Sequence, residues 1–339
     1  MWRKIARVSA YMLAVALIVT YMCYASNLAS KHRAQQQIEE VVISLPNNSE
    51  EHNFTSVSQV LEDLKENGLI VEGTSVDNVD VLAISKHIAK AGYVCSANAY
   101  VTYAGKLYIE VMQHCPVLRL LCGDFNTYAT AENYVFCVPS QSSCYAPVVT
   151  GCYKPLFPSD YEGVVGDYYA ELIADEAQVV TELDNELSGL ARDKKQVVDK
   201  LSSAKNSAAD KYKEELASLT SLENALTERK QTAEARKKKL QKKSDDFVNL
   251  TNFVSEVNND AFWSAEIVQY VADTTYTGDI SLRLIPRSGN FVIEFGTLNN
   301  SGAKLEKLRK FYDKGLSHMG WNRYKSVDVR YDKQIICKE

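Results

Sequence analysis

The sequence predicts an α+β protein with an N-terminal transmembrane helix, a compact α+β unit, and a mixed β domain interrupted by an antiparallel helical hairpin (coiled coil). Three observations lead to this prediction. Residues 8–25 carry no charge, residues 39–115 show alternating strand and helix patterns, and residues 167–246 lack proline and contain one glycine. The predicted domains are 1–25 (cytoplasmic tip and transmembrane helix), 26–38 (linker), 39–115 (α+β unit), 116–166 with 247–339 (β domain) and 167–246 (inserted hairpin).

The first 25 residues are expected to anchor the protein in a membrane. The run VSAYMLAVALIVTYMCYA at 8–25 is long enough to cross a hydrocarbon core of about 30 Å as a helix. Arg3, Lys4 and Arg7 precede it, so the positive-inside rule places the N-terminus in the cytoplasm. The residues expected to hold the helix in the membrane are Val8, Leu13, Leu17, Ile18 and Tyr24.

A cleaved signal peptide is the alternative interpretation of this segment. Cys23-Tyr24-Ala25 is acceptable as a cleavage site with small residues at its outer positions. The apolar run is longer than that of most signal peptides, and tyrosines lie near both of its ends, as interfacial anchors do. These features favour a retained anchor.

The order of elements at 39–115 is strand, helix, helix, strand, strand. Thr55 or Ser56 can cap the first helix, and Gly68 ends it. Ala104-Gly105 separates two alternating runs, which indicates a hairpin. The predicted elements are a strand at 40–45, helices at 57–64 and 79–90, and strands at 94–103 and 106–113.

The β domain is predicted from short alternating runs on either side of the hairpin. Turn residues separate these runs, as in Arg287-Ser288-Gly289. An amphipathic helix is expected before Gly315, since Leu305, Leu308 and Phe311 have helical spacing. The predicted strands lie near 128 and at 134–138, 148–150, 265–272, 280–285, 290–295, 326–331 and 334–337.

Charge distribution predicts that residues 167–246 fold back on themselves. Residues 171–186 hold six acids and no base, whereas residues 229–243 hold eight bases and one acid. A reversal near Lys205-Asn206-Ser207 would lay the acidic start beside the basic end, with arms about 50 Å long. Leucines, valines and alanines at three- and four-residue spacing form the expected seam. A stalk with solvated charges and a true docking surface both fit this pattern.

Composition and motifs argue against several classes of function. The net charge is −5 and no basic face is interleaved with aromatics, so no nucleic-acid partner is expected. The chain lacks GxSxG, GxxxxGK[ST], HExxH and GxGxxG, so we expect no enzyme, no catalytic residue, no cofactor, no metal and no small-molecule substrate.

The cysteines and one charged pair permit narrower predictions. Seven of the eight cysteines follow the membrane segment, an odd number that cannot pair completely, and we expect buried thiols with at most one bridge.

Asp328 and Arg330 share a strand face at a period of two. We interpret them as a pair that sets a surface or a register, with a partner contact as the alternative.

Several segments resemble the FtsQ/DivIB cell-division proteins in their Bacteroidetes form. The segments that carry the resemblance are FWSAEI at 262–267, LIPRSGN at 284–290, KLEKLRKFY at 304–312, GWN at 320–322, VDVRY at 327–331 and YAPVVTG at 145–151. The unit at 39–115 is similar to the POTRA module of that family, and the coiled-coil insertion is not part of the common family pattern.

The resemblance implies a non-catalytic, single-pass protein of the cell inner membrane, located at the division septum with its bulk in the periplasm. It would bind FtsB-like and FtsL-like division proteins and link early division proteins to septal peptidoglycan synthesis. The partner's strand would add to the last strand of the β domain, corresponding to 331–336, with Tyr331 and Lys333 at the family's contact positions. The expected partner-binding residues are Arg330, Tyr331, Asp332, Lys333, Gln334, Ile335 and Ile336. The alternative is a periplasmic POTRA-type chaperone or translocation module whose coiled coil binds clients.

Overall fold

The computed structural model describes residues 2–47, 53–70, 73–138, 144–204, 206–316, 320 and 323–339. The chain divides into two compact units. The first comprises residues 1–114 with 139–145, and the second comprises residues 115–138 and 146–339.

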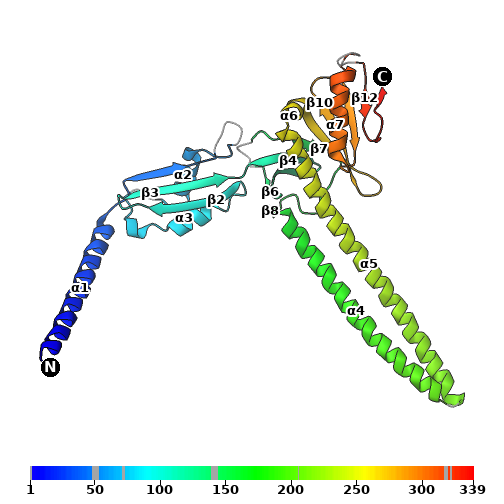
Figure 1. Ribbon diagram of the computed structural model, residues 1–339, viewed down its shortest axis with the longest axis horizontal. Coiled ribbons are helices and arrows are strands. Elements are labelled where there is room, and N and C mark those ends of the chain that lie inside the picture. Colours follow the sequence, from blue (N-terminus) through cyan, green and yellow to red (C-terminus); the bar gives the residue numbers. More distant parts are fainter. Residues whose placement is uncertain are drawn as a thin grey trace. The chain divides into compact units, whose positions relative to one another are not determined.

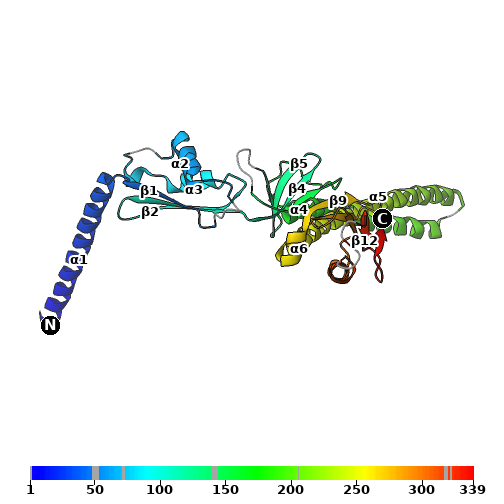
Figure 2. The same ribbon diagram turned by 90° about the horizontal axis from the view of Figure 1, so that it is seen from above.

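The first unit contains the predicted α+β domain (Figure 1). Its three-stranded sheet has the order β1-β3-β2, with β1 parallel and β2 antiparallel to β3. The two α-helices cover the same face of the sheet, as Figure 2 shows. The elements are β1 (Glu40–Ser44), α2 (Val57–Glu66), the 3-10 helix η1 (Val76–Asn78), α3 (Val81–Ile88), β2 (Val94–Val101) and β3 (Lys106–Gln113).

Local signals explain where these helices begin. The Ser56 side chain accepts a hydrogen bond from the backbone N–H of Gln59, and the Gln59 side chain accepts one from the backbone N–H of Ser56. This reciprocal pair is a capping box. Asp80 caps α3 by accepting a hydrogen bond from the N–H of Ala83, so α3 starts at Val81 rather than at the predicted position 79.

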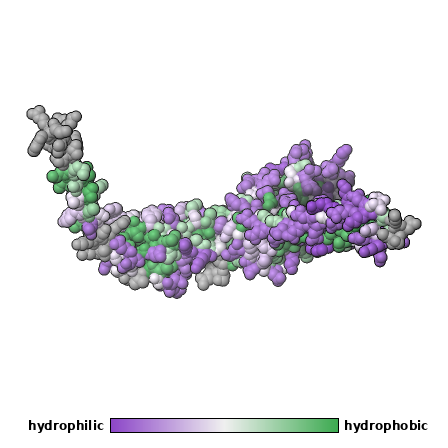
Figure 3. All heavy atoms as spheres, turned by 90° about the horizontal axis from the view of Figure 1, so that it is seen from below, coloured by the Kyte–Doolittle hydropathy of each residue, from purple (hydrophilic) through white to green (hydrophobic). Residues whose placement is uncertain are grey.

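Helix α1 (Trp2–Gln35) precedes this domain. Its side chains are described from residue 12 to residue 28 and are exposed throughout, and Figure 3 shows apolar surface on this part of the helix. Within the described residues, none of the helices meets both the length and the apolar character that a membrane crossing demands. The side chain of Val8 lies outside the described residues. Helix α1 also continues from Ser26 to Gln35, into the segment predicted as a linker.

The second unit is built on a ten-stranded mixed sheet of order β13-β12-β11-β10-β9-β7-β4-β5-β6-β8. Most neighbours are antiparallel, but β4, β7 and β9 run parallel, as do β11 and β12. The strands are β4 (Pro116–Cys122), β5 (Phe125–Thr130), β6 (Tyr134–Cys137), β7 (Val148–Thr150), β8 (Gly163–Val164), β9 (Ile267–Thr274), β10 (Ile280–Pro286), β11 (Val292–Gly296), β12 (Ser326–Asp328) and β13 (Ile336–Lys338).

The predicted helical hairpin is confirmed. Helix α4 (Val165–Ser203) and helix α5 (Asn206–Asn259) run antiparallel and contact each other along their length (Figure 1). Leu183, Leu190 and Leu226 are buried in the seam. Lys230 pairs with Asp184 at 2.6 Å, so the basic and acidic blocks do lie side by side.

Helix α5 connects the hairpin to the sheet without a break. Its C-terminal part buries Phe247, Leu250 and Val254 in the same core as strands β4, β9 and β11. Three short helices, α6 (Ala261–Glu266), α7 (Ser301–Phe311) and the π-helix η2 (Tyr312–Leu316), complete the unit.

Cys23, Cys95, Cys122, Cys137, Cys152 and Cys337 are free thiols. Only Cys122 is fully buried. The expectation of buried thiols is therefore wrong for Cys95, Cys115 and Cys152, which are exposed.

Candidate partner-binding edge of the sheet

The C-terminal residues form one edge of the ten-stranded sheet. Strand β12 pairs in parallel with β11, and β13 pairs antiparallel with β12, so that Val327 lies opposite Cys337. In the described part of the chain, β13 has a neighbour on one side only. An edge strand of this kind presents backbone N–H and C=O groups that another chain can pair with.

The predicted extent of the last strand is wrong. Residues 331–333 form a turn, and the terminal strand begins at Ile336. Of the seven predicted partner-binding residues, only Ile336 lies in a strand. The reason is geometric: β12 ends at Asp328 and β13 runs antiparallel to it, so the chain between them must reverse direction.

Asp328 and Arg330 form the predicted pair, but the prediction that they share a strand face is wrong, because β12 ends at Asp328 and Arg330 lies beyond it. Arg330 donates to the Asp328 carboxylate from Nη2 at 2.6 Å, from Nε at 2.9 Å and from its backbone N–H at 3.0 Å. The Asp328 side chain is 9% exposed. Hydrogen bonds from the Arg330 side chain hold the pKa of Asp328 below its usual value of 3.8. The pair stabilises the chain where β12 enters the turn.

Lys307 holds the same turn from helix α7. Its Nζ donates to the carbonyl oxygen of Val329 at 2.9 Å and also to the carbonyl oxygen of Tyr331. Sequence reasoning missed Lys307, because helical spacing predicts its helix and gives no sign of what its side chain contacts across 24 residues of chain.

The surface of the turn is polar with one aromatic side chain. Tyr331 is 48% exposed, and Asp332, Lys333 and Gln334 are exposed beside it. Ile335 and Cys337 are half-buried and pack against the core. The seven predicted partner-binding residues therefore lie together at one corner of the sheet, with Ile335 facing inward and Tyr331 facing outward.

No group of three or more His, Cys, Asp or Glu side chains is arranged to hold a metal ion anywhere among the residues the structure describes. The features of this corner are a free strand edge, an exposed tyrosine and flanking charges. Such features suit recognition of a peptide.

Comparison with known families assigns the two units. A model described as "FtsQ/DivIB, C-terminal related" matches residues 215–338, and a model of the POTRA-like domain matches residues 37–112. The chain is an FtsQ/DivIB-type protein. A comparison with curated proteins gives no match.

The matched regions of this FtsQ/DivIB-type protein include its candidate edge. The C-terminal match begins inside α5 and extends through β13, whereas α4 lies outside both matches. The two domains are those of a division-related POTRA protein and belong to non-catalytic scaffold families. FtsQ/DivIB proteins are a division-associated, membrane-anchored family.

Proposed function

We propose that this FtsQ/DivIB-type protein is a non-catalytic divisome scaffold that binds FtsB-like and FtsL-like partners and links early division proteins to septal peptidoglycan synthesis. The observation that carries the proposal is the free edge of β13, which lies inside the region matched by the FtsQ/DivIB C-terminal family.

In this proposal a partner segment adds to the sheet beside β13. Backbone hydrogen bonds supply affinity and side-chain contacts supply specificity. Tyr331 is a rigid amphipathic anchor whose ring is exposed, while Asp332 and Lys333 offer charges on either side of a partner strand. The Arg330–Asp328 pair and Lys307 order the turn before the partner arrives, which lowers the entropic cost of binding.

The proposal places α1 in the cell inner membrane, with the N-terminus cytoplasmic and the bulk of the protein periplasmic at the division septum. Leu13, Leu17, Ile18 and Tyr24 are all more than half exposed on this helix, and the helix is uncharged from residue 8 to residue 25. A helix with apolar side chains exposed on every side suits lipid rather than water.

Photo-crosslinking in dividing cells tests the proposal. A photoreactive residue replaces Tyr331, and a matched probe replaces Tyr276, a fully exposed tyrosine in the turn between β9 and β10 of the same unit. A third probe replaces Val198, which is exposed on the hairpin. Capture of one small bitopic protein from position 331, absent from position 276, is the expected result.

A different outcome would favour the chaperone alternative. That function predicts many envelope proteins captured from position 198 and no specific partner from position 331. Fluorescent fusions add a second readout, since a division scaffold concentrates at midcell and a general chaperone distributes around the envelope.

A further inference from the structure

One flank of the hairpin carries a row of acids along α4. The row consists of Glu171, Asp175, Glu182, Glu186 and Asp193, all of them exposed. The spacings along the row are four and seven residues, which keeps the side chains on one face of a helix with 3.6 residues per turn. Glu182 also accepts a hydrogen bond from Gln178, one turn earlier.

A row of bases faces the same way on α5. Arg229, Arg236 and Lys239 are exposed and are spaced by seven and three residues. The basic row lies level with the first half of the acidic row, because Arg236 reaches Glu176 at 4.0 Å and Lys230 pairs with Asp184.

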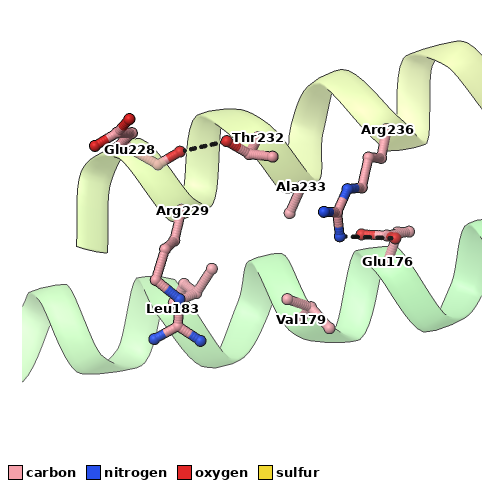
Figure 4. Close-up of a pocket in the computed structure, with 8 residues that line it drawn as sticks. All are labelled: Glu176, Val179, Leu183, Glu228, Arg229, Thr232, Ala233 and Arg236. Atoms are coloured by element: carbon pink, nitrogen blue, oxygen red, sulfur yellow. Dashed lines mark hydrogen bonds and ion pairs between the residues drawn. The ribbon is translucent and has the colours of Figure 1, made fainter. Parts of the chain in front are cut away.

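A groove of about 350 Å³ lies between the two helices on this flank, and polar side chains (Glu176, Glu228, Arg229, Thr232 and Arg236) make up most of its lining. Val179, Leu183 and Ala233 are its apolar lining residues, and Leu183 and Ala233 are buried while Val179 is partly exposed. Figure 4 shows Arg229 and Arg236 extending from α5 on either side of Ala233, toward α4. Val179 is 41% exposed in this groove, which is unfavourable for a valine on a water-facing surface.

Charges on the opposite flank are used within the hairpin. Lys230 pairs with Asp184 at 2.6 Å and Lys194 pairs with Glu223 at 2.5 Å. Over the described residues, Arg229, Asp175 and Glu186 take part in no ion pair, and Arg236 makes one at the distance limit. The groove flank therefore keeps acidic and basic rows whose charges are largely uncompensated.

We infer that the groove flank is an interface for a second copy of this chain. A two-fold axis parallel to the hairpin stacks α4 of one copy on α5 of the other at the same height, so each acidic row meets a basic row. The same operation brings the two grooves together and removes both Val179 side chains from water. Such an interface is self-complementary, as two-fold symmetry requires.

The charge pattern also excludes the other face-to-face arrangement. A two-fold axis across the hairpin would stack α4 on α4 and place acid near acid, which costs free energy. The inferred arrangement keeps both hairpins pointing in the same direction, and it uses residues outside the β13 edge, so it is independent of the proposed function.

The size of the contact sets its expected strength. The acidic row spans 22 residues of α4, but the basic row spans ten residues of α5, or roughly 15 Å, and two helices side by side are about 20 Å wide. A footprint of roughly 300 Å² per copy over the charged rows is below that of stable specific interfaces, so we expect a weak dimer that dissociates as salt screens the charges.

Crosslinking between differently tagged full-length chains tests the inference. A photoreactive residue at Val179 should give a product containing both tags. Reversing the basic row (Arg229→Glu with Arg236→Glu) should weaken dimerisation about tenfold, as should reversing part of the acidic row (Glu182→Lys with Glu186→Lys). Mixing these two variants should restore the product, because each supplies the charge that the other lacks.

The matched control is Lys195→Glu with Lys238→Glu, which changes the net charge equally on the opposite flank and should leave the product unchanged. Circular dichroism checks that every variant keeps its helix content. Sedimentation of the detergent-solubilised full chain at low and high salt gives a second measurement. A monomer at all concentrations, a product at Val179 that contains another protein instead, or no restoration on mixing would overturn the inference.

Discussion

A Cβ atom added to Gly296 would lie 2.7 Å from Cγ of Arg330 and 2.9 Å from its Cδ. Gly296 ends β11 with φ +74°, and the aliphatic part of Arg330 lies over it while the guanidinium reaches Asp328. A glycine in the neighbouring strand thus makes room for the side chain that orders the turn before β13.

The substitution Gly296→Ala should therefore destabilise the β domain. It places a Cβ in the left-handed region, at a cost of about 1–2 kcal/mol, and displaces the Arg330 side chain from Asp328. Gly278→Ala is the matched control, because Gly278 has φ +83° with open space around it and incurs the backbone cost alone. Thermal unfolding of both variants measures the difference, and equal losses would show that the Arg330 contact contributes nothing.

The Asp328→Asn variant should lower the free energy of unfolding by about 1 kcal/mol at neutral pH, because it weakens the charged hydrogen bonds from Arg330. The pKa of Asp328 is lowered in the folded state. The contribution of this carboxylate to the free energy of unfolding is therefore present above pH 4 and is lost as pH falls through the pKa of the folded state. The difference between wild type and variant should shrink below pH 4 in urea unfolding. A constant difference would contradict this.

Tyr331→Ala should weaken binding of the division partner at least about tenfold if its ring is an interface anchor. Because Tyr331 is 48% exposed and outside the core, the folding stability should change little. Tyr276→Ala removes an equally large exposed ring elsewhere in the unit and should leave binding unchanged. Affinity can be measured with the purified partner's periplasmic segment, and equal effects of the two substitutions would argue against the β13 corner.

Leu190→Ala should destabilise the hairpin by about 2–3 kcal/mol, because it removes a side chain that is 6% exposed in the seam with Leu183 and Leu226. Val198→Ala on the same helix should cost less than about 0.5 kcal/mol, since Val198 is 46% exposed. Amide hydrogen exchange along α4 and α5 measures the loss of hairpin stability in each variant. Unchanged protection in the Leu190→Ala variant would mean that the seam does not hold the arms together.

Cys122 should be alkylated more slowly than the exposed cysteines. Burial raises the pKa of Cys122 to about 11, so at pH 8 its reactive thiolate is scarce and shielded. Cys95 and Cys152 are exposed and should react first with iodoacetamide under native conditions. Mass spectrometry of the digested protein measures the order, and early labelling of Cys122 would show that the β4 core opens readily.

Much of the local structure was predictable from neighbouring residues. Ser56 with Gln59, the Ala104-Gly105 turn and the opposed charge blocks each act over a few residues or within one helix pair, and each produced the expected element. The Asp328–Arg330 pair was predictable for the same reason, since its partners are two residues apart. The extent of the last strand was not predictable, because it depends on where the chain reverses, and a hydrogen bond from the distant Lys307 to the carbonyl oxygen of Val329 fixes that position.

The sequence by itself determined the order of elements in the N-terminal α+β unit, the helical hairpin and the resemblance to FtsQ/DivIB proteins, because periodicity, caps and motifs are local properties of the chain. Tertiary structure alone decided that β7 lies between β4 and β9, and that β13 is left at the edge. The physical reason is that strand order depends on pairing between segments more than 100 residues apart, such as Val149 with Tyr270. The groove on the hairpin has the same origin: the antiparallel register brings Val179 and Leu183 of α4 together with Ala233 of α5.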